Sequence, residues 1–162
     1  MFFTFRGHVS AWDGEYFSRK GALRVRISLN NHTVDLVVTH QVGESLDFWN
    51  QEVDVNEKVR QGQTMELLRF VESSCSDSDL VVLGGDFNFD ETDDSYRFVT
   101  EANFTDTGAE EGQDVKKRVT WGHPENKWGN SPAYLIDYVF VRSNNDELRV
   151  EGSSTIPEKA FQ

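Results

Sequence analysis

The sequence predicts an α/β fold in which a mixed sheet carries helices packed on it. Apolar and polar residues alternate over 22–29, which is typical of a strand, and 34–39 is predicted to be the returning strand of a hairpin. Apolar residues near a 3.6-residue period follow over 57–73, and a short apolar run comes at 80–83. Strand, helix and further strands in this order favour one α/β domain over residues 1–162, a length sufficient to bury a core.

The first predicted elements are a short strand and a hairpin. Residues 1–5 are rich in aromatic side chains and predict the short strand. Along 22–29 the apolar side chains share one face and two arginines share the other. Asn30-Asn31-His32 supplies turn residues, so 34–39 is the returning strand, with His40 at its end. The two faces comprise Leu23, Val25, Ile27 and Leu29 against Arg24 and Arg26.

A polar loop over 41–52 then leads to a helix. Asn56 is a candidate N-cap, because asparagine side chains accept hydrogen bonds from the first amides of a helix. The helix is expected to end by Ser73, and residues 74–79 form a polar linker. Its apolar positions are Val59, Leu67, Leu68 and Val71.

The second half of the chain predicts a short helix and more strands. Asp93, Asp94 and Ser95 are candidate N-caps for a helix that ends near Ala102. Residues 103–117 are acidic and poor in apolar side chains, which indicates a surface loop. Later strands are expected at 119–121, 134–141 and 148–155.

The segment 80–90 carries the clearest chemical signal. Leu80 to Leu83 predicts a buried strand, and two glycines follow it. Asp86 and Asn88 are two residues apart, so in an extended segment they point to the same side. A carboxylate and an amide at the end of a buried strand can bind a hard cation or a phosphate oxygen. The bland alternative is that both side chains only cap the following turn.

Composition excludes several classes of site. Apolar residues make up 37% of the chain, as in a folded globule. Acidic residues outnumber basic ones by 28 to 16, giving a net charge of −12 that disfavours a nucleic-acid partner without excluding one. The single cysteine, Cys75, excludes an intrachain disulfide framework. No apolar run is long enough to span a bilayer and no signal peptide is evident, so we expect a cytoplasmic or membrane-associated location.

Three motifs resemble the endonuclease/exonuclease/phosphatase superfamily. They are Thr39-His40, Gly85-Asp86-Phe87-Asn88 and Ile136-Asp137-Tyr138, in the family's order and rough spacing. The resemblance implies part of a four-layer α/β sandwich, DNase-I-like, with mixed, mainly antiparallel sheets. The neutral sphingomyelinase branch is the most similar, on the basis of Ser18-Arg19-Lys20-Gly21-Ala22-Leu23, the extension of the second motif to Asp90, and Arg60-Gln61-Gly62-Gln63.

The resemblance implies a catalytic set of His40, Asp86, Asn88 and Asp137. In that set Asp86 and Asn88 bind Mg²⁺, and His40 and Asn88 bind the substrate phosphate. Asp137 orients a histidine that acts as general base. The implied reaction is hydrolysis of a sphingomyelin-like phosphodiester lipid to ceramide and phosphocholine.

The chain departs from the family pattern at both ends. The glutamate that is the family's principal Mg²⁺ ligand is absent, since Gln51-Glu52 lies on the wrong side of His40. The Asp-His pair that supplies the general base is absent too, because none of the histidines follows an aspartate. The resemblance therefore implies an internal portion of the fold that is inactive by itself.

Several alternatives stay open. A nuclease or deadenylase of the same superfamily is the competing enzyme, and a degenerate binding or scaffold domain is the non-enzymatic alternative. Asp137 could be a structural carboxylate paired with Arg142 or Lys127. Arg60 and Gln63 fit the helix surface and site support equally well. We expect Lys116-Lys117-Arg118 to be a solvated charge run and Trp121 and Trp128 to be packing residues. The oligomeric state stays open.

Overall fold

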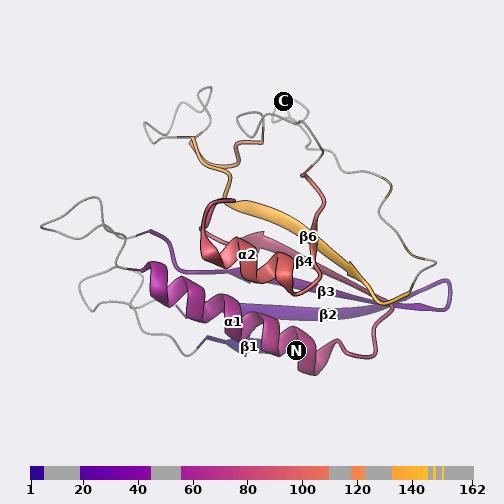
Figure 1. The fold of residues 1–162 in the computed structure, drawn as a ribbon. Helices are drawn as coiled ribbons and strands as arrows, with labels where there is room; N and C mark the ends of the chain where they lie inside the picture. Colours follow the sequence, from indigo (N-terminus) through magenta and orange to yellow (C-terminus); the bar gives the residue numbers. More distant parts are fainter. Residues whose placement is uncertain are drawn as a thin grey trace, which may run out of the picture.

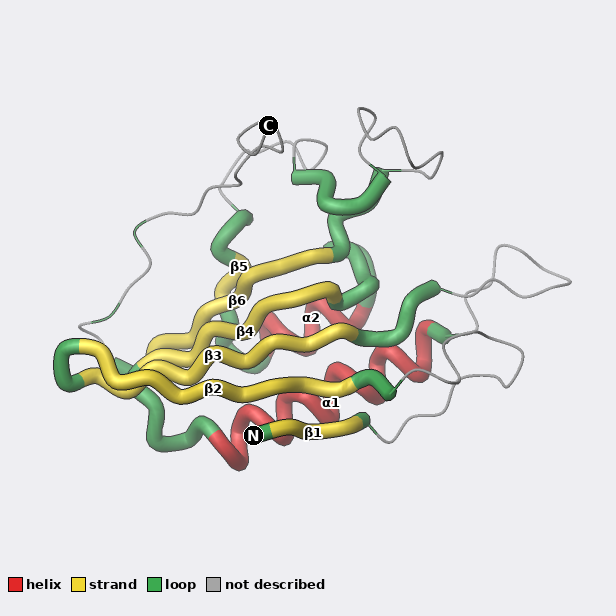
Figure 2. The backbone as a smooth tube through the Cα atoms, turned by 180° about the vertical axis from the view of Figure 1, so that it is seen from behind, coloured by secondary structure: helices red, strands yellow, loops and turns green. Residues whose placement is uncertain are grey.

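The computed structural model describes residues 1–5, 19–44, 56–109, 118–122, 133–145, 148 and 151. Within these ranges six strands form one sheet in the order β1-β2-β3-β4-β6-β5, and both helices lie on the same side of it (Figures 1 and 2). The elements are β1 (Phe2–Thr4), β2 (Gly21–Leu29), β3 (His32–His40), α1 (Glu57–Ser74), β4 (Leu80–Asp86), α2 (Asp94–Glu101), β5 (Thr105–Asp106) and β6 (Asp137–Ser143). The predicted α/β class is confirmed.

The predicted hairpin is β2 and β3. Its register runs from Gly21 opposite His40 to Leu29 opposite His32. Asn30 and Asn31 both have positive φ angles, 50° and 70°, as tight two-residue hairpin turns require. The turn residues therefore set the register that carries His40 to the far end of the hairpin.

The sheet is mixed and mainly antiparallel, as expected. Strand β4 runs parallel to β3 after a crossover through α1, and the other neighbouring pairs are antiparallel. The Asp93 carboxylate caps α2 by accepting from the Ser95 amide at 2.7 Å. Asn56 occupies the N-cap position of α1 as predicted, but its side chain does not cap the helix, because its amide donates instead to the Gly43 carbonyl at 3.1 Å.

The core lies between the sheet and the two helices. Strands β4 and β6 contribute to this core the side chains that point toward the helices. Helix α1 contributes the buried side chains of its C-terminal half. Aromatic rings dominate this layer, with Phe140 packed edge-on against Phe87 at 5.3 Å between ring centroids. Fully buried members are Leu67, Val71, Cys75, Val81, Leu83, Phe87, Val99 and Phe140.

The opposite side of the sheet carries exposed apolar side chains. The register pairs Leu23 with Val38, Val38 with Gly84 and Gly84 with Val139, so these residues share one face. No described helix covers that face (Figure 2). We call it the open face, and its exposed apolar members are Phe2, Leu23, Val25, Ile27, Leu29, Val38 and Val139.

The arginines of β2 lie on the helix-covered face. Arg24 and Arg26 both contact Asp35 of β3, at 2.8 and 2.9 Å, and this carboxylate is fully buried. Ser78 also donates a hydrogen bond to it. The alternation of β2 is therefore as predicted, and the charged side is the one that the helices cover.

Three predicted features of the second half are wrong. The predicted loop 103–117 contains β5, which pairs with β6. Residues 119–121 make only an isolated bridge from Trp121 to Tyr134, and Trp121 is exposed. Strand β6 begins at Asp137 because β4, its partner, ends at Asp86.

Arg118 is part of a predicted charge run, but it is paired. Its guanidinium contacts Asp106 and Glu91 at 2.7 and 2.8 Å, and its side chain is mostly buried. The structure describes Leu148 and Glu151 alone of the predicted strand 148–155, and it assigns neither to a strand. Lys116, Lys117, Lys127 and Trp128 lie outside the described residues. Neither of the described helices has the length and apolar character needed to span a membrane.

Candidate active site

A row of polar side chains crosses three neighbouring strands at one end of the sheet. His40 is the last residue of β3, Asp86 the last of β4 and Asp137 the first of β6. The register pairs His40 with Asp86 and Asp86 with Asp137, and residues directly paired across strands point to the same face. His40 Nε2 lies 3.5 Å from Asp86 Oδ2. The row therefore borders the open face.

Asn88 joins this row through a turn. Strand β4 ends at Asp86, and Asn88 has a left-handed φ of 53°. Its backbone amide donates to Asp86 Oδ1 at 3.0 Å, and its side-chain Nδ2 donates to the Gln41 carbonyl at 2.9 Å. The predicted extended geometry is therefore wrong, but the Asp86 turn still places the Asn88 side chain beside the row.

The glycine of the motif allows β3 and β4 to approach here. Gly85 has a φ of 136°, and a Cβ at this position would collide with the Thr39 carbonyl oxygen. Only glycine readily adopts this backbone conformation. This backbone geometry is the reason that glycine precedes Asp86 in the motif.

The electrostatics of the row favour a bound cation. Burial raises the pKa of Asp86, and the facing Asp137 carboxylate raises that pKa further. His40, the Asn88 amide and Lys20 act in the opposite direction without cancelling the shift. A cation placed between the two carboxylates would remove their mutual repulsion.

Lys20 also lies at this site, although no pattern in the sequence predicted it. Its Nζ lies 2.9 Å from His40 Nε2. Lys20 is part of the sphingomyelinase-like segment 18–23, but nothing in that segment marks lysine as a functional residue. The hairpin register is the signal that could have found it, because the next residue, Gly21, pairs with His40.

Arg60 and Gln63 are buried supports of the site. Arg60 Nη2 lies 3.1 Å from Asp93 Oδ2 at the start of α2. Gln63 Oε1 accepts from the Val42 amide at 2.9 Å, in the segment just after His40. Of the two alternatives for these residues, the helix surface is therefore excluded.

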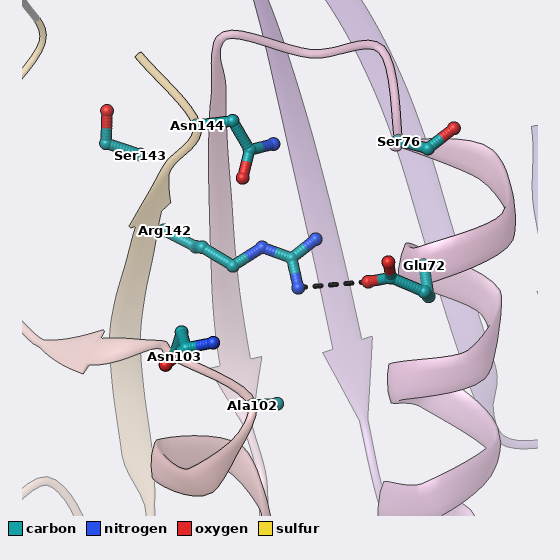
Figure 3. A pocket seen from close by; sticks show the side chains of 7 residues that line it. All are labelled: Glu72, Ser76, Ala102, Asn103, Arg142, Ser143 and Asn144. Carbon is teal, nitrogen blue, oxygen red and sulfur yellow. Dashed lines mark hydrogen bonds and ion pairs between the residues drawn. The ribbon is translucent and has the colours of Figure 1, made fainter. Parts of the chain in front are cut away.

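Asp137 does not pair with Arg142, and Lys127, the other structural partner considered above, lies outside the described residues. Asp137 is exposed, and Arg142 instead contacts Glu72 of α1, with 3.1 Å between Nη1 and Oε2. This pair borders a hollow at the other end of the sheet, where Leu80 pairs with Ser143 (Figure 3). The hollow therefore belongs to a different part of the molecule from the polar row. Its lining residues are Glu72, Ser76, Ala102, Asn103, Arg142, Ser143 and Asn144.

The donors of the row match a hard cation in type but not in number. Asp86, Asp137 and the Asn88 amide supply oxygen, the ligand atom that Mg²⁺ prefers. Within the described residues no group of three or more histidine, cysteine, aspartate or glutamate side chains is arranged to hold a metal. Further ligands would have to complete such a site.

Comparison with known proteins gives a family and a fold. The Endonuclease/Exonuclease/phosphatase family matches residues 4–158. No curated protein matches the chain. Among solved structures it is similar to a Staphylococcus aureus beta toxin mutant with bound magnesium ions (TM-score 0.62, 22% identity, 82% of this chain and 46% of that chain).

Two further solved structures share the fold. Sphingomyelinase C from Streptomyces griseocarneus has a TM-score of 0.60 and 19% identity, over 93% of this chain and 50% of that chain. The human Nocturnin catalytic domain with bound sulfate anion has a TM-score of 0.58 and 16% identity, over 87% and 46%. The chain thus spans about half the length of the structures it matches. Because the family match covers nearly every residue, the chain belongs to the Endonuclease/Exonuclease/phosphatase family.

Proposed function

We propose that this chain forms part of the active site of a Mg²⁺-dependent phosphodiester hydrolase that converts sphingomyelin to ceramide and phosphocholine. The observation that carries the proposal is the cross-strand row of His40, Asp86 and Asp137, with Asn88 beside it. Similarity to a sphingomyelinase C and the sphingomyelinase-like segments of the sequence support the choice of substrate.

The proposed metal site lies at Asp86, in the middle of the row. Asp86 and the Oδ1 atom of Asn88 would hold Mg²⁺, and the beta toxin structure with bound magnesium ions supports the choice of metal. When bound, the ion supplies Lewis-acid polarisation of a phosphoryl oxygen. The raised pKa of Asp86 fits this role, because a carboxylate that is costly to ionise alone gains most from a cation.

The remaining residues would handle the phosphate and the protons. His40, with the Lys20 ammonium at 2.9 Å, would contact a phosphate oxygen or assist departure of the alcohol. Asp137 would hold the imidazole of a general base in its productive tautomer. None of the histidines of this sequence follows an aspartate as the family motif requires, and general acid–base groups contribute ~10²–10⁴-fold to rates, so we expect these residues alone to give little activity.

A lipid substrate fits the charge of the chain better than a nucleic acid does. The net charge of −12 opposes a polyanionic strand, which a nuclease or deadenylase of the same family would have to bind.

Mg²⁺ titration of the chain, followed by nuclear magnetic resonance, tests the metal site directly. We expect Mg²⁺ to shift the signals of His40, Asp86 and Asn88, and Asp86→Ala to abolish these shifts. Glu72→Gln is the matched control, because Glu72 is an exposed carboxylate at the other end of the sheet. Equal Mg²⁺ binding by the Asp86→Ala variant would remove Asp86 from the mechanism.

Binding assays separate the substrate classes. With Mg²⁺ present, vesicles containing sphingomyelin should retain the chain, and a single-stranded oligonucleotide should not compete. Retention by the oligonucleotide alone would favour the nuclease or deadenylase. Binding of either ligand without Mg²⁺, unchanged in Asp86→Ala, would favour a non-catalytic binding domain.

A further inference from the structure

The N-terminal half of α1 buries polar side chains instead of apolar ones. Gln63 and Thr64 are 3% and 0% exposed, and Asn56, just before the helix, is 1% exposed. The C-terminal half of the same helix buries Leu67 and Phe70 in the usual way. Buried polar groups are costly unless they form hydrogen bonds, so these side chains must have a structural or functional use.

Their partner is the segment Gln41–Gly43, which directly follows His40. The Val42 amide donates to Gln63 Oε1 at 2.9 Å. The Thr64 hydroxyl lies 3.1 Å from Gln41 Oε1 and 3.0 Å from the Arg60 carbonyl oxygen, so its one proton is shared between these two acceptors, and the Thr64 and Gln41 side chains are fully buried. Asn56 binds the Gly43 carbonyl. Each residue of the segment is therefore held by a different polar side chain of α1 or its N-cap position.

The same segment holds the end of β4. The Gln41 amide donates to the Asp86 carbonyl at 3.0 Å, and the Gln41 carbonyl accepts from Asn88 Nδ2 at 2.9 Å. The orientation of the Asn88 amide is thereby fixed, with its nitrogen engaged by Gln41. No described residue donates to Asn88 Oδ1, so this oxygen is available to coordinate a cation.

We propose that Gln63 and Thr64 are positioning residues, which fix the Asn88 amide through Gln41 and Val42 so that its Oδ1 faces the ligand. The inference deepens the proposed function and rests on it for the ligand, Mg²⁺. The connection runs through two hydrogen bonds that join α1 to Gln41 and to Val42, and two more that join Gln41 to Asp86 and to Asn88, all of 3.1 Å or less. Neither Gln63 nor Thr64 contacts the ligand in this scheme.

The test compares variants that remove the network with one that preserves it. Thr64→Val and Gln63→Met remove the hydroxyl and the acceptor at nearly constant volume, and Thr64→Ser keeps the hydroxyl. Leu67→Val is the matched control, because it disturbs the same helix at a fully buried position outside the network. The readouts are the side-chain amide signals of Asn88 and the Mg²⁺ affinity of the whole chain.

We expect Thr64→Val and Gln63→Met to shift the Asn88 side-chain signals and to weaken Mg²⁺ binding about tenfold, the lower end of what loss of a supporting partner costs a metal site. Thr64→Ser should restore both readouts, and Leu67→Val should leave both unchanged. Asn88 signals that stay in place in Thr64→Val and Gln63→Met would overturn the inference. If those signals shift but Mg²⁺ fails to bind the unaltered chain, the proposed metal role fails while the positioning stands.

Discussion

The two faces of the sheet differ in almost every property, although they are built from alternate residues of the same strands. In β4, Val81 and Leu83 are fully buried beneath the helices, while Asp86 lies on the side of the open face. In β6, Phe140 is fully buried and its neighbour Val139 is half exposed. The helix-covered face therefore carries the packing, and the other face carries the candidate chemistry at its end.

Two aspartates, one on each face, show the same contrast in their pKa values. Burial alone would raise the pKa of Asp35, but hydrogen bonds from Arg26, Arg24 and Ser78 hold that pKa well below its usual range. Burial raises the pKa of Asp86, and its neighbour Asp137 adds to the increase. One carboxylate is stabilised as an anion by the protein, and the other is left to be stabilised by a ligand.

The largest loss of stability should come from removing a large core side chain on the helix-covered face. Phe140→Ala should lower the free energy of unfolding by about 3–5 kcal/mol, because it leaves a cavity among the aromatic rings. Val139→Ala, one residue away and 48% exposed, should cost less than about 1 kcal/mol. Urea denaturation measures both. An equal cost at Val139 would show that a further layer covers the open face in solution.

The charge contrast predicts the next largest effect. Asp35→Asn should cost about 3 kcal/mol, because it leaves Arg24 partly buried without its counter-charge. Asp86→Asn should not lower stability, since ionisation of Asp86 is unfavourable in the fold, but it should weaken Mg²⁺ binding. Thermal unfolding and Mg²⁺ titration of both variants test this opposition. The contrast fails if Asp86→Asn destabilises the fold as much as Asp35→Asn does.

The two pKa shifts also predict opposite responses to acid. The pKa of Asp35 is lower in the folded state, so its stabilisation is complete above the ordinary value near 4 and is lost as the pH falls below it. The pKa of Asp86 is raised, so acidification protonates it first, relieving a cost to the fold and removing a metal ligand. Mg²⁺ affinity should therefore fall at a higher pH than the one at which the fold unfolds. Titrations of Mg²⁺ binding and circular dichroism against pH, with Asp86→Asn as the control, would reveal any coincidence of the two transitions.

The smallest effect is expected in the middle of the open face. Val25→Lys places a charge at a position that is 47% exposed, so the free energy of unfolding should change by no more than about 0.5 kcal/mol. Analytical ultracentrifugation of the same variant should give an unchanged sedimentation coefficient. Strong destabilisation or a change of assembly state would show that Val25 is covered in solution.

Local signals in the sequence determined much of the fold. Asn30 and Asn31 fixed the hairpin, because asparagine tolerates the positive φ angles of its turn. Asp93 fixed the start of α2, because its cap bond joins residues two apart. The motif from Gly85 to Asn88 placed Asp86 at the end of a strand, although a turn from Asp86 to Asn88 replaces the extended segment that was predicted there. Family membership followed from three such motifs in order.

Tertiary structure decided what no local pattern contains. Alternation gave β2 two faces, but only the docking of the helices selected the side of Arg24 as the covered one, with Asp35 as its counter-charge. The sequence placed Asn56 at the start of α1, but it could not show that the Asn56 side chain would donate to the Gly43 carbonyl instead of capping the helix. Lys20 reached His40 only through the register of a folded hairpin. Periodicity records which residues share a face, whereas burial and partnership depend on which other segment packs there.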